Sequence, residues 1–444
     1  MEKAKRESFG SRFGIIAATA GAAVGLGNIW KFPFETGENG GSAFILLYIL
    51  FVIILGLPVM VTEFTIGRHG QSDATGSFKR IAPGTGWSRL GYLSILTSFI
   101  IICFYSTVAG WTLEYTFNAF RIVSSDAQPG EYFGEFISNP YRPVIWQATI
   151  LLLTALIVLR GVTKGIERFS KLLMPLLLVL VLIICIRSLM LNGASAGLEF
   201  LFSPDFSKIT PAVVLSACGQ AFFSLSIGNG GVLTYGSYVS KDVNMVSTSL
   251  QVSMADTIVA ILAGVMIFPA VFAFGVEPAA GPSLVYITLP QVFASMHLGQ
   301  IWGLIFFLLL TLAALTSMIN LLEVTTLFFV DHVRLSRPAA VLTTVLLVAL
   351  VGIPATLSMG VLSGARLFGK SFFDLLDFTA SNLLMPLGGL LMVIFVAWGP
   401  GQRMFAEEVT NRGTINATWL RVFQVLLKYI VPLLIALILI AGLI

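Results

Sequence analysis

The sequence contains little charge, few cysteines and few histidines. Of its 444 residues, 11% are charged and 57% are hydrophobic, and the mean hydropathy is +0.92, whereas an average soluble domain is about 25% charged. This imbalance excludes a soluble globular domain, a disordered chain and a nucleic-acid-binding protein. The three cysteines lie in apolar runs without a C-x-x-C spacing, and the three histidines are far apart. Neither a disulfide framework nor a bound metal cluster is expected.

Long apolar runs fill most of the chain. A helix needs about 20 apolar residues to cross a bilayer, and we expect eleven such spans, at residues 12–36, 42–66, 90–120, 143–160, 166–190, 211–238, 244–274, 288–330, 338–357, 372–398 and 419–443. The runs are continuous and not alternating, which favours helices over a β-barrel. The sequence therefore predicts an all-α membrane protein with eleven transmembrane helices and one transporter domain, residues 1–444.

Lysine and arginine are distributed unequally over the two sides of these spans. Most of them lie in the N-terminal segment and in the loops on its side of the membrane, and positive loops face the cytoplasm. We therefore expect a cytoplasmic N-terminus and, with eleven spans, a C-terminus outside. The localisation predicted is the plasma membrane, which in a bacterium is the inner membrane. The lipid bilayer is an expected partner; neither nucleic acid nor an obligate protein partner is inferred.

Two of the spans are interrupted by glycines. The first reads TAGAAVGLGNIWKFP and the sixth FFSLSIGNGGVLTYGSY. Corresponding interrupted helices in two halves of a chain are typical of transporters built from inverted repeats. We expect one repeat at about 10–192, a second at about 208–400, and an additional span at about 419–443. An unwound stretch frees carbonyls that can bind a cation and N–H groups that can bind a carboxylate.

These segments resemble the neurotransmitter:sodium symporter family, especially its bacterial amino-acid transporters. The resemblance rests on GAAVGLGNIWKFPFETGENGGSAF, GLPVMVTEFTIGRHG, GVTKGIERFSKLLMP, GQAFFSLSIGNGGVLTYGSYVSKD, ITLPQVF, AALTS and FFDLLDF, and it covers spans 1–10. Family members usually have twelve spans, and some bacterial members, like this chain, have eleven. The resemblance implies a five-plus-five inverted repeat with broken helices 1 and 6, and sodium-coupled symport by alternating access.

The resemblance also implies two sodium sites. The positions that match the first are Ala23, Asn28, Ser224 and Asp256, and those that match the second are Gly21, Val24, Ala313, Thr316 and Ser317. Oxygen ligands of this kind suit a hard cation. The family commonly has asparagine where Asp256 stands. Chloride-dependent members also have a serine where this chain has Ala260. We therefore expect Asp256 to supply the negative charge and transport to be independent of chloride.

The resemblance implies a substrate site between the same spans. Its matching positions are Ala22, Leu26, Gly27, Ile101, Tyr105, Phe223, Ser226, Asn229, Ser317 and Leu321. Tyr105 matches a tyrosine that hydrogen-bonds the substrate carboxylate, and Phe223 matches an aromatic lid. Amine-transporting relatives have an aspartate where this chain has Gly25, so the substrate is expected to bring its own carboxylate. The mostly apolar lining favours a neutral, hydrophobic or aromatic amino acid.

Three further groups of residues match gates and supports of the family. Lys31 and Asp377 match an outer gate pair, and Arg6 and Asp331 match an inner one. Glu63 matches a glutamate that braces the unwound part of span 1 through backbone N–H groups. Gly165 and Pro175 have the G-x9-P spacing at which related transporters unwind span 5.

Several of these residues also have an ordinary structural explanation. Thr316 and Ser317 can bond carbonyls of their own helix, and an exposed gate pair is worth about 0–1 kcal/mol. We find no nucleophile–base pair, phosphate loop or catalytic metal motif, so a transporter is expected and not an enzyme. The alternatives are a proton-coupled amino-acid transporter, a non-transporting amino-acid sensor or channel on the same scaffold, and a chloride-dependent carrier of amines or osmolytes.

Overall fold

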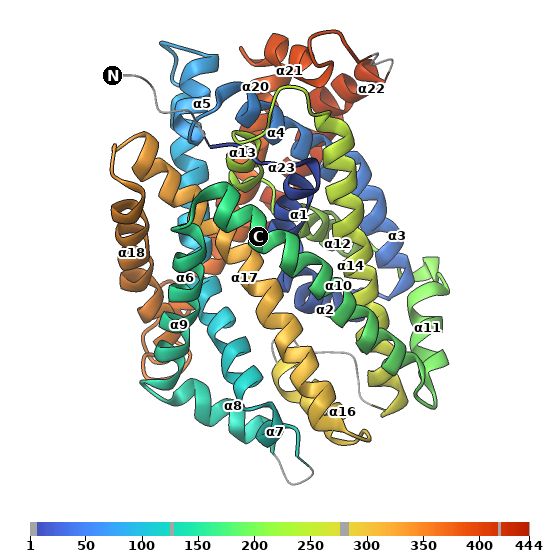
Figure 1. Cartoon of the computed structure of the whole chain (residues 1–444). Coiled ribbons are helices and arrows are strands. Elements are labelled where there is room, and N and C mark those ends of the chain that lie inside the picture. Colours follow the sequence, from blue (N-terminus) through green and yellow to red (C-terminus); the bar gives the residue numbers. More distant parts are fainter. Residues whose placement is uncertain (1–6, 125–127, 276–283, 416–418, 444) are drawn as a thin grey trace.

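The computed structural model describes residues 7–124, 128–275, 284–415 and 419–443, and these ranges are almost entirely helical (Figure 1). The first half contains α1 (Arg12–Ala23), η1 (Gly27–Lys31), α2 (Phe32–Glu38), α3 (Ser42–Phe51), η2 (Val52–Gly56), α4 (Leu57–Gly70), α5 (Ala74–Ile81), α6 (Ser88–Phe117), α7 (Ala119–Ile122), α8 (Pro129–Ser138), α9 (Arg142–Val158), η3 (Val162–Glu167), α10 (Arg168–Leu189) and α11 (Ala194–Phe202).

The second half continues in the same way. It contains η4 (Phe206–Lys208), α12 (Pro211–Ser224), α13 (Gly231–Gly236), α14 (Met245–Ala273), η5 (Leu284–Thr288), α16 (Leu289–Ala294), α17 (Gly299–Asp331), α18 (Arg337–Leu357), α19 (Phe372–Phe378), η6 (Thr379–Leu384), α20 (Met385–Ala397), α21 (Gln402–Val409), α22 (Leu420–Val425), η7 (Leu426–Ile430) and α23 (Val431–Leu443). Apart from η4, a 3-10 turn, the η elements are π-helical turns, most of them within longer helices.

The expected spans coincide with helices, although not all of these are long enough to count as spans by themselves. Eight helices of the described residues are long and apolar enough to cross a membrane, or up to ten if two bent helix pairs each count as one span. One such pair is α1 with η1–α2, bent by 51°. The expected span 288–330 is divided, because α16 ends at Ala294 and α17 begins only at Gly299. The all-helical membrane fold is confirmed, and the count of eleven stays a prediction.

Capping side chains fix where several of these helices begin. The Ser11 side chain accepts a hydrogen bond from the Gly14 N–H at the start of α1, and Thr210 and Asn244 do the same for α12 and α14. The first N–H groups of a helix have no partner within the helix, and in a membrane protein such groups must be satisfied. These polar residues therefore mark the ends of spans in an otherwise apolar sequence.

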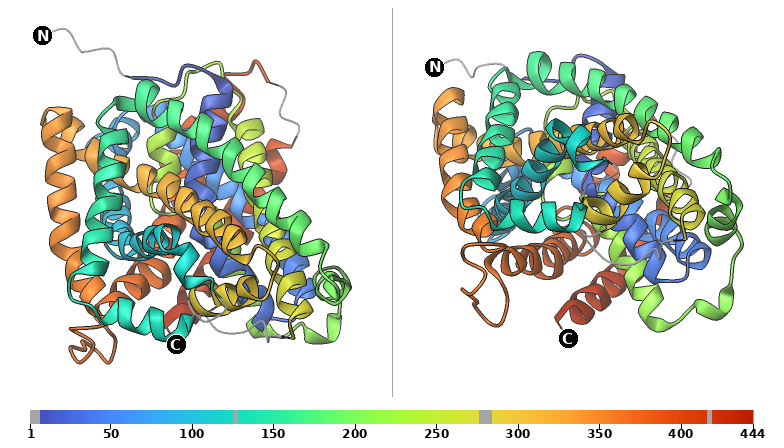
Figure 2. Two further views of the ribbon diagram at one scale, coloured as in Figure 1. Left: turned by 60° about the horizontal axis from the view of Figure 1, so that its bottom comes forward. Right: turned by 90° about the horizontal axis from the view of Figure 1, so that it is seen from below.

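The long helices surround a buried centre that contains both broken spans. Figure 1 shows α17 crossing the middle of the bundle, with α18 and α11 at opposite edges; the view from below in Figure 2 shows the same surround. α1 packs against α10, α14 and α17, so the first break is enclosed on several sides. Large apolar side chains on the outer helices are exposed, among them Leu346 and Leu350 of α18 and Leu433 of α23. Such surfaces suit contact with lipid.

Both glycine-rich interruptions are breaks in the structure. α1 ends at Ala23 before η1 begins at Gly27, and α12 ends at Ser224 before α13 begins at Gly231. In the second break Gly228 has φ +88°, and a Cβ added there would lie 2.2 Å from the Met385 carbonyl oxygen. Only glycine permits both this conformation and this close approach.

Span 5 is helical throughout the G-x9-P stretch at which unwinding was predicted. η3 contains Gly165 and α10 contains Pro175 without interruption. A Cβ at Gly165 would lie 2.2 Å from the Ile157 carbonyl oxygen, so the preceding helix packs directly on this glycine. Span 5 is thus helical through this stretch in the described conformation, and the unwinding of the stretch stays a prediction.

Candidate functional site

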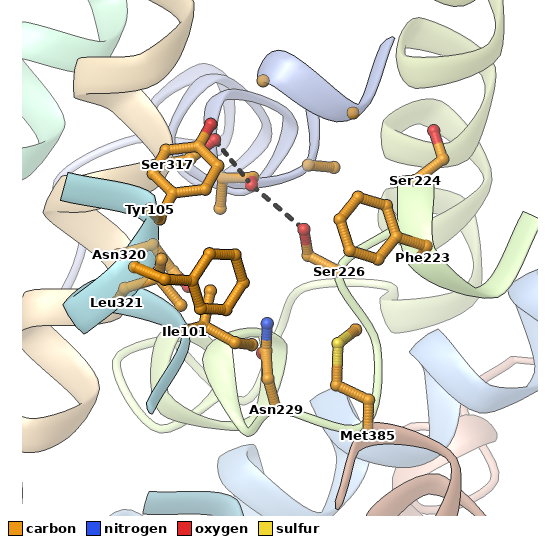
Figure 3. Close-up of a pocket in the computed structure, with 15 residues that line it drawn as sticks. Ile101, Tyr105, Phe223, Ser224, Ser226, Asn229, Ser317, Asn320, Leu321 and Met385 are labelled. Carbon is orange, nitrogen blue, oxygen red and sulfur yellow. Dashed lines mark hydrogen bonds between the residues drawn. The ribbon is translucent and has the colours of Figure 1, made fainter. Parts of the chain in front are cut away.

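A pocket lies between the two breaks and the facing helices (Figure 3). The space in it that the centre of a water-sized sphere can occupy is about 40 Å³. Nine of the ten predicted substrate residues line it: Ala22, Gly27, Ile101, Tyr105, Phe223, Ser226, Asn229, Ser317 and Leu321. The tenth, Leu26, lines the adjacent outer cavity, and its backbone N–H donates to the Tyr105 hydroxyl at 3.1 Å. The structure therefore brings the predicted set together from spans 1, 3, 6 and 8.

One end of this pocket carries polar groups and the remainder is mostly apolar. Ser226 and Ser317 each donate a hydrogen bond to the Ala22 carbonyl, both at 3.3 Å (Figure 3). None of the pocket's 15 described lining residues is charged. A Cβ at Gly25 would lie 2.4 Å from Ser317 Oγ and 2.9 Å from the Tyr105 hydroxyl oxygen. Glycine at this position thus leaves the polar end open.

The residues predicted for the first sodium form a buried hydrogen-bonded cluster beside this end. Asn28 Nδ2 donates to Asp256 Oδ1 at 2.8 Å and to Ser224 Oγ at 3.1 Å. Ser224 Oγ in turn donates to Asp256 Oδ2 at 2.7 Å. Asn28 Oδ1 accepts from the Gly25 N–H at 3.1 Å, which ties the cluster to the first break. Ala23 and Ser224 also line the pocket, so a cation at the cluster would lie close to a bound ligand.

Asp256 has one partner that the sequence did not indicate. The Tyr48 hydroxyl donates to Asp256 Oδ2 at 3.3 Å, and both side chains are completely buried. Tyr48 stands in an apolar run of span 2 with no polar neighbour along the sequence. Only the packing of α3 against the rest of the bundle reveals its contact.

The residues predicted for the second sodium also lie together, on α1 and α17. Thr316 Oγ1 donates to the Ala313 carbonyl at 2.9 Å and approaches the Val24 carbonyl at 3.5 Å. Ser317 Oγ approaches the Ala313 carbonyl at 3.4 Å. A Cβ at Gly21 would lie 3.3 Å from Thr316 Cβ. Hydroxyl and carbonyl oxygens thus converge here from two spans, which is the donor set that a hard cation needs.

Glu63 braces a break, but not the one that was expected. Its carboxylate accepts hydrogen bonds from the backbone N–H groups of Gly228 at 2.5 Å and of Leu233 at 3.4 Å, both in or just after the second break. The expectation that it holds span 1 is therefore wrong for this structure. The physical reason for a carboxylate is the same at either break, because unpaired backbone N–H groups at membrane depth require an acceptor.

The outer pair Lys31 and Asp377 does not form an ion pair within the described residues. Both line an outer cavity of about 210 Å³ by the same measure, which shares Gly27, Phe104, Tyr105 and Phe223 with the inner pocket. Lys31 Nζ lies 4.0 Å from the centre of the Phe223 ring, and Asp377 Oδ1 accepts from Ser381 Oγ at 2.8 Å. The lysine thus caps the aromatic lid through a cation–π contact and is not paired with the aspartate.

The inner pair is described only in part, because Arg6 lies outside the described residues. Asp331 Oδ2 accepts from the Asp73 backbone N–H at 2.9 Å. Burial, with the nearby Asp331 carboxylate, raises the pKa of Asp73 above its ordinary value. The N-terminal segment nearby is fastened to span 5, since the Gly10 N–H donates to Glu167 Oε2 at 2.6 Å.

A second polar network on this side joins span 2 to the loop after span 10. Arg68 Nε lies 2.6 Å from Glu408 Oε2, and Lys241 Nζ lies 3.0 Å from Glu408 Oε1. Burial alone raises the pKa of Glu408, but the hydrogen bond with His69 and the charges of Arg68 and Lys241 lower it to about 2. In the sequence analysis Arg68 served only as one of the positive residues that set the orientation of the spans, and its pairing with Glu408 was not predicted.

Three lining residues of the pocket were also missed. Phe104, Asn320 and Met385 join the predicted set from spans 3, 8 and 10. Asn320 is one residue before the predicted Leu321, and Phe104 one before Tyr105. Met385 had no sequence signal; it lines the pocket from span 10, and its backbone carbonyl lies close to Gly228 of the second break.

Comparison with known proteins now decides the family. The profile of the sodium:neurotransmitter symporter family matches residues 6–128 and 139–444. The chain belongs to this family. A sodium-dependent transporter of Bacillus subtilis (strain 168), YhdH, is 40% identical over 98% of this chain and 97% of its own length. A sodium-dependent transporter of Haemophilus influenzae is 35% identical over 99% of this chain and 98% of its own.

A solved structure of the same family has nearly the same fold. MhsT in complex with L-phenylalanine is 45% identical and superimposes with a TM-score of 0.91, over 99% of this chain and all of that one. Members of the sodium:neurotransmitter symporter family are transporters and not enzymes. The chain is therefore an integral membrane protein that uses sodium, and its all-helical fold with two broken helices matches that of MhsT. The five-plus-five inverted repeat stays a prediction.

Proposed function

We propose that this chain carries neutral, hydrophobic or aromatic L-amino acids into the cell together with sodium, by alternating access and without chloride. The observation that carries the proposal is the uncharged polar end of the pocket. There the Leu26 N–H, the Tyr105 hydroxyl and the break around Gly25 meet, with no acidic side chain among the described lining residues. An amine would leave its charge unpaired at this place, whereas an amino acid brings a carboxylate.

In this proposal, a sodium ion beside the polar end of the pocket supplies the positive charge that binds the substrate carboxylate. The Asp256 cluster, predicted as the first sodium site, lies next to the pocket through Ala23 and Ser224. A cation bound there attracts the substrate carboxylate, so each ligand raises the affinity for the other by the same factor. The Asp256 carboxylate supplies the negative charge beside the cation, which is why we expect no chloride requirement. The Thr316 cluster is proposed as the second site.

The wall of the pocket suits an apolar side chain. Ile101, Phe104, Leu321 and Met385 form most of the surface away from Tyr105, and Phe223 separates the pocket from the outer cavity. MhsT, which is 45% identical, is described in complex with L-phenylalanine, and this supports an aromatic ligand here. One transporter domain is proposed, with repeats at about 10–192 and 208–400, a cytoplasmic N-terminus and a C-terminus outside.

Uptake into proteoliposomes tests the proposal. The purified protein is reconstituted with an inward sodium gradient, or with choline in place of sodium, each in chloride and in gluconate. We expect accumulation of labelled phenylalanine in sodium only, equal in the two anions, and competition by leucine but not by phenethylamine, which lacks only the carboxylate. Equal uptake in choline would favour proton coupling, and sodium-dependent binding without accumulation would favour a sensor. Inhibition by phenethylamine as strong as by phenylalanine would contradict the carboxylate argument.

A further inference from the structure

We propose that Asn229 points an amide N–H donor at the far end of the substrate pocket and so makes the preferred substrate an aromatic amino acid with an oxygen at the para position of its ring, as in tyrosine. The inference rests on the proposed function and deepens it, because it names the substrate class of the same site.

The orientation of the Asn229 side chain is set by its neighbours in the second break. The Gly231 backbone N–H donates to Asn229 Oδ1 at 2.8 Å, and Ser98 Oγ donates to the Asn229 carbonyl at 2.7 Å. A backbone N–H can only donate, so the atom that faces Gly231 must be the amide oxygen. The Nδ2 group is therefore turned the other way, and Figure 3 shows it pointing into the cavity.

This amide group has no hydrogen-bond partner among the described residues and is open to the cavity, while Asn229 as a whole is only 3% exposed. The neighbouring Asn320 differs, because its Nδ2 donates to the Gly231 carbonyl at 3.4 Å. Buried polar groups are normally paired, and one that is left unpaired in a binding pocket indicates a partner on the ligand.

The position of Asn229 decides which part of the ligand it meets. In Figure 3 it lies across the cavity from Tyr105 and Ser317, on the side of Ile101 and Met385. An amino acid whose carboxylate lies at the Tyr105 end therefore directs its side-chain tip at the Asn229 amide. The apolar walls favour an aromatic body, and the amide favours an acceptor at the tip.

Substrates with other side chains fit the apolar walls and the Asn229 donor less well than tyrosine does. Phenylalanine and leucine fill the apolar part but leave the Asn229 donor buried without a partner, which weakens binding. A carboxamide side chain offers an acceptor but also buries two N–H donors against apolar walls. The tyrosine hydroxyl offers the acceptor and has a single O–H to place.

The test compares KM values for sodium-dependent uptake of tyrosine, phenylalanine and 4-aminophenylalanine. For the unchanged protein we expect a KM for tyrosine about tenfold or more below that for phenylalanine. Asn229→Asp keeps the acceptor for the Gly231 N–H and replaces the donor by an acceptor. In this variant the preference for tyrosine over phenylalanine is expected to fall, and 4-aminophenylalanine, which carries donors at the para position, is expected to gain relative to phenylalanine.

The outcomes separate this inference from the proposed function. Sodium-dependent uptake with equal KM values for tyrosine and phenylalanine would overturn the role of Asn229 and leave the proposed function intact. A tyrosine preference that persists unchanged in Asn229→Asp would overturn it as well. Failure of every amino acid to be taken up in a sodium-dependent way would overturn both. Thermal unfolding of each protein in detergent provides the measure of folded protein.

Discussion

Replacing Asp256 by asparagine tests the proposed first sodium site most directly. The substitution keeps the size of the side chain but removes its charge and exchanges one acceptor oxygen for an NH2 donor. In the structure the two carboxylate oxygens accept from Asn28 at 2.8 Å, Ser224 at 2.7 Å and Tyr48 at 3.3 Å. An asparagine would set its NH2 group against at least one of these donors.

Two effects weaken sodium binding in this variant. A buried donor that loses its acceptor costs about 1–3 kcal/mol. The attraction between two unit charges about 4 Å apart is about 4 kcal/mol at an effective dielectric constant of about 20. Because about 1.4 kcal/mol corresponds to a factor of ten, we expect the sodium concentration for half-maximal uptake to rise at least about tenfold. The substrate KM at a fixed subsaturating sodium concentration is expected to rise with it, because the coupling is reciprocal.

The assay is uptake into proteoliposomes over a sodium titration, with choline keeping the ionic strength constant. Asp374→Asn is the matched control. Asp374 is exposed on α19, so this substitution removes the same charge at a site away from the pocket. Thermal unfolding in detergent checks that both variants are folded. A half-maximal sodium concentration within twofold of the unchanged protein, in a folded Asp256→Asn variant, would refute the role of the Asp256 charge in binding sodium.

Three further substitutions test other parts of the argument. Gly25→Ala places a methyl group 2.4 Å from Ser317 Oγ; we expect at least tenfold weaker substrate binding, measured by competition with labelled ligand, and partial recovery when Ser317→Ala is added. Glu63→Gln keeps one acceptor for the two N–H groups of the second break but adds a donor there, so thermal unfolding should show a loss of about 1–3 kcal/mol. Glu408→Gln should lower the melting temperature at pH 7. Because the folded pKa of Glu408 is about 2 and its usual value about 4.5, its stabilisation is present above about pH 4.5 and is lost as the pH falls toward 2, so the difference between the two proteins should narrow over that range.

The sequence was sufficient for the fold because the signals are long and repeated. An apolar run of about 20 residues leaves few structural choices in a membrane, and two glycine-rich interruptions five spans apart predicted the breaks at Gly25 and Gly228. The family resemblance supplied the substrate residues, nine of which line one pocket. What it could not supply was the separation of α16 from α17, because the gap is only four residues long and its two polar residues, Ser295 and His297, interrupt a much longer apolar run.

Expectations about particular partners were less successful. Glu63 was expected at the first break and bonds the second, and Lys31 was expected to pair with Asp377 but lies over Phe223. In both cases the sequence identified a charged side chain that needs a partner, while the partner depends on distances across the bundle. Contacts of Tyr48 with Asp256 were missed for the same reason.

The two breaks are held by side chains from other spans, and this links binding to movement. Backbone groups at membrane depth need partners. At the end of α1, just before the first break, the Ala22 carbonyl accepts from both Ser226 and Ser317, so one oxygen joins span 1 to spans 6 and 8. The Leu26 N–H is held by Tyr105 of span 3. A bound carboxylate that engages the Tyr105 hydroxyl or the Leu26 N–H changes these bonds between spans. In the proposed mechanism, substrate binding therefore changes the contacts that fix span 1 relative to its neighbours, which is the coupling that alternating access requires.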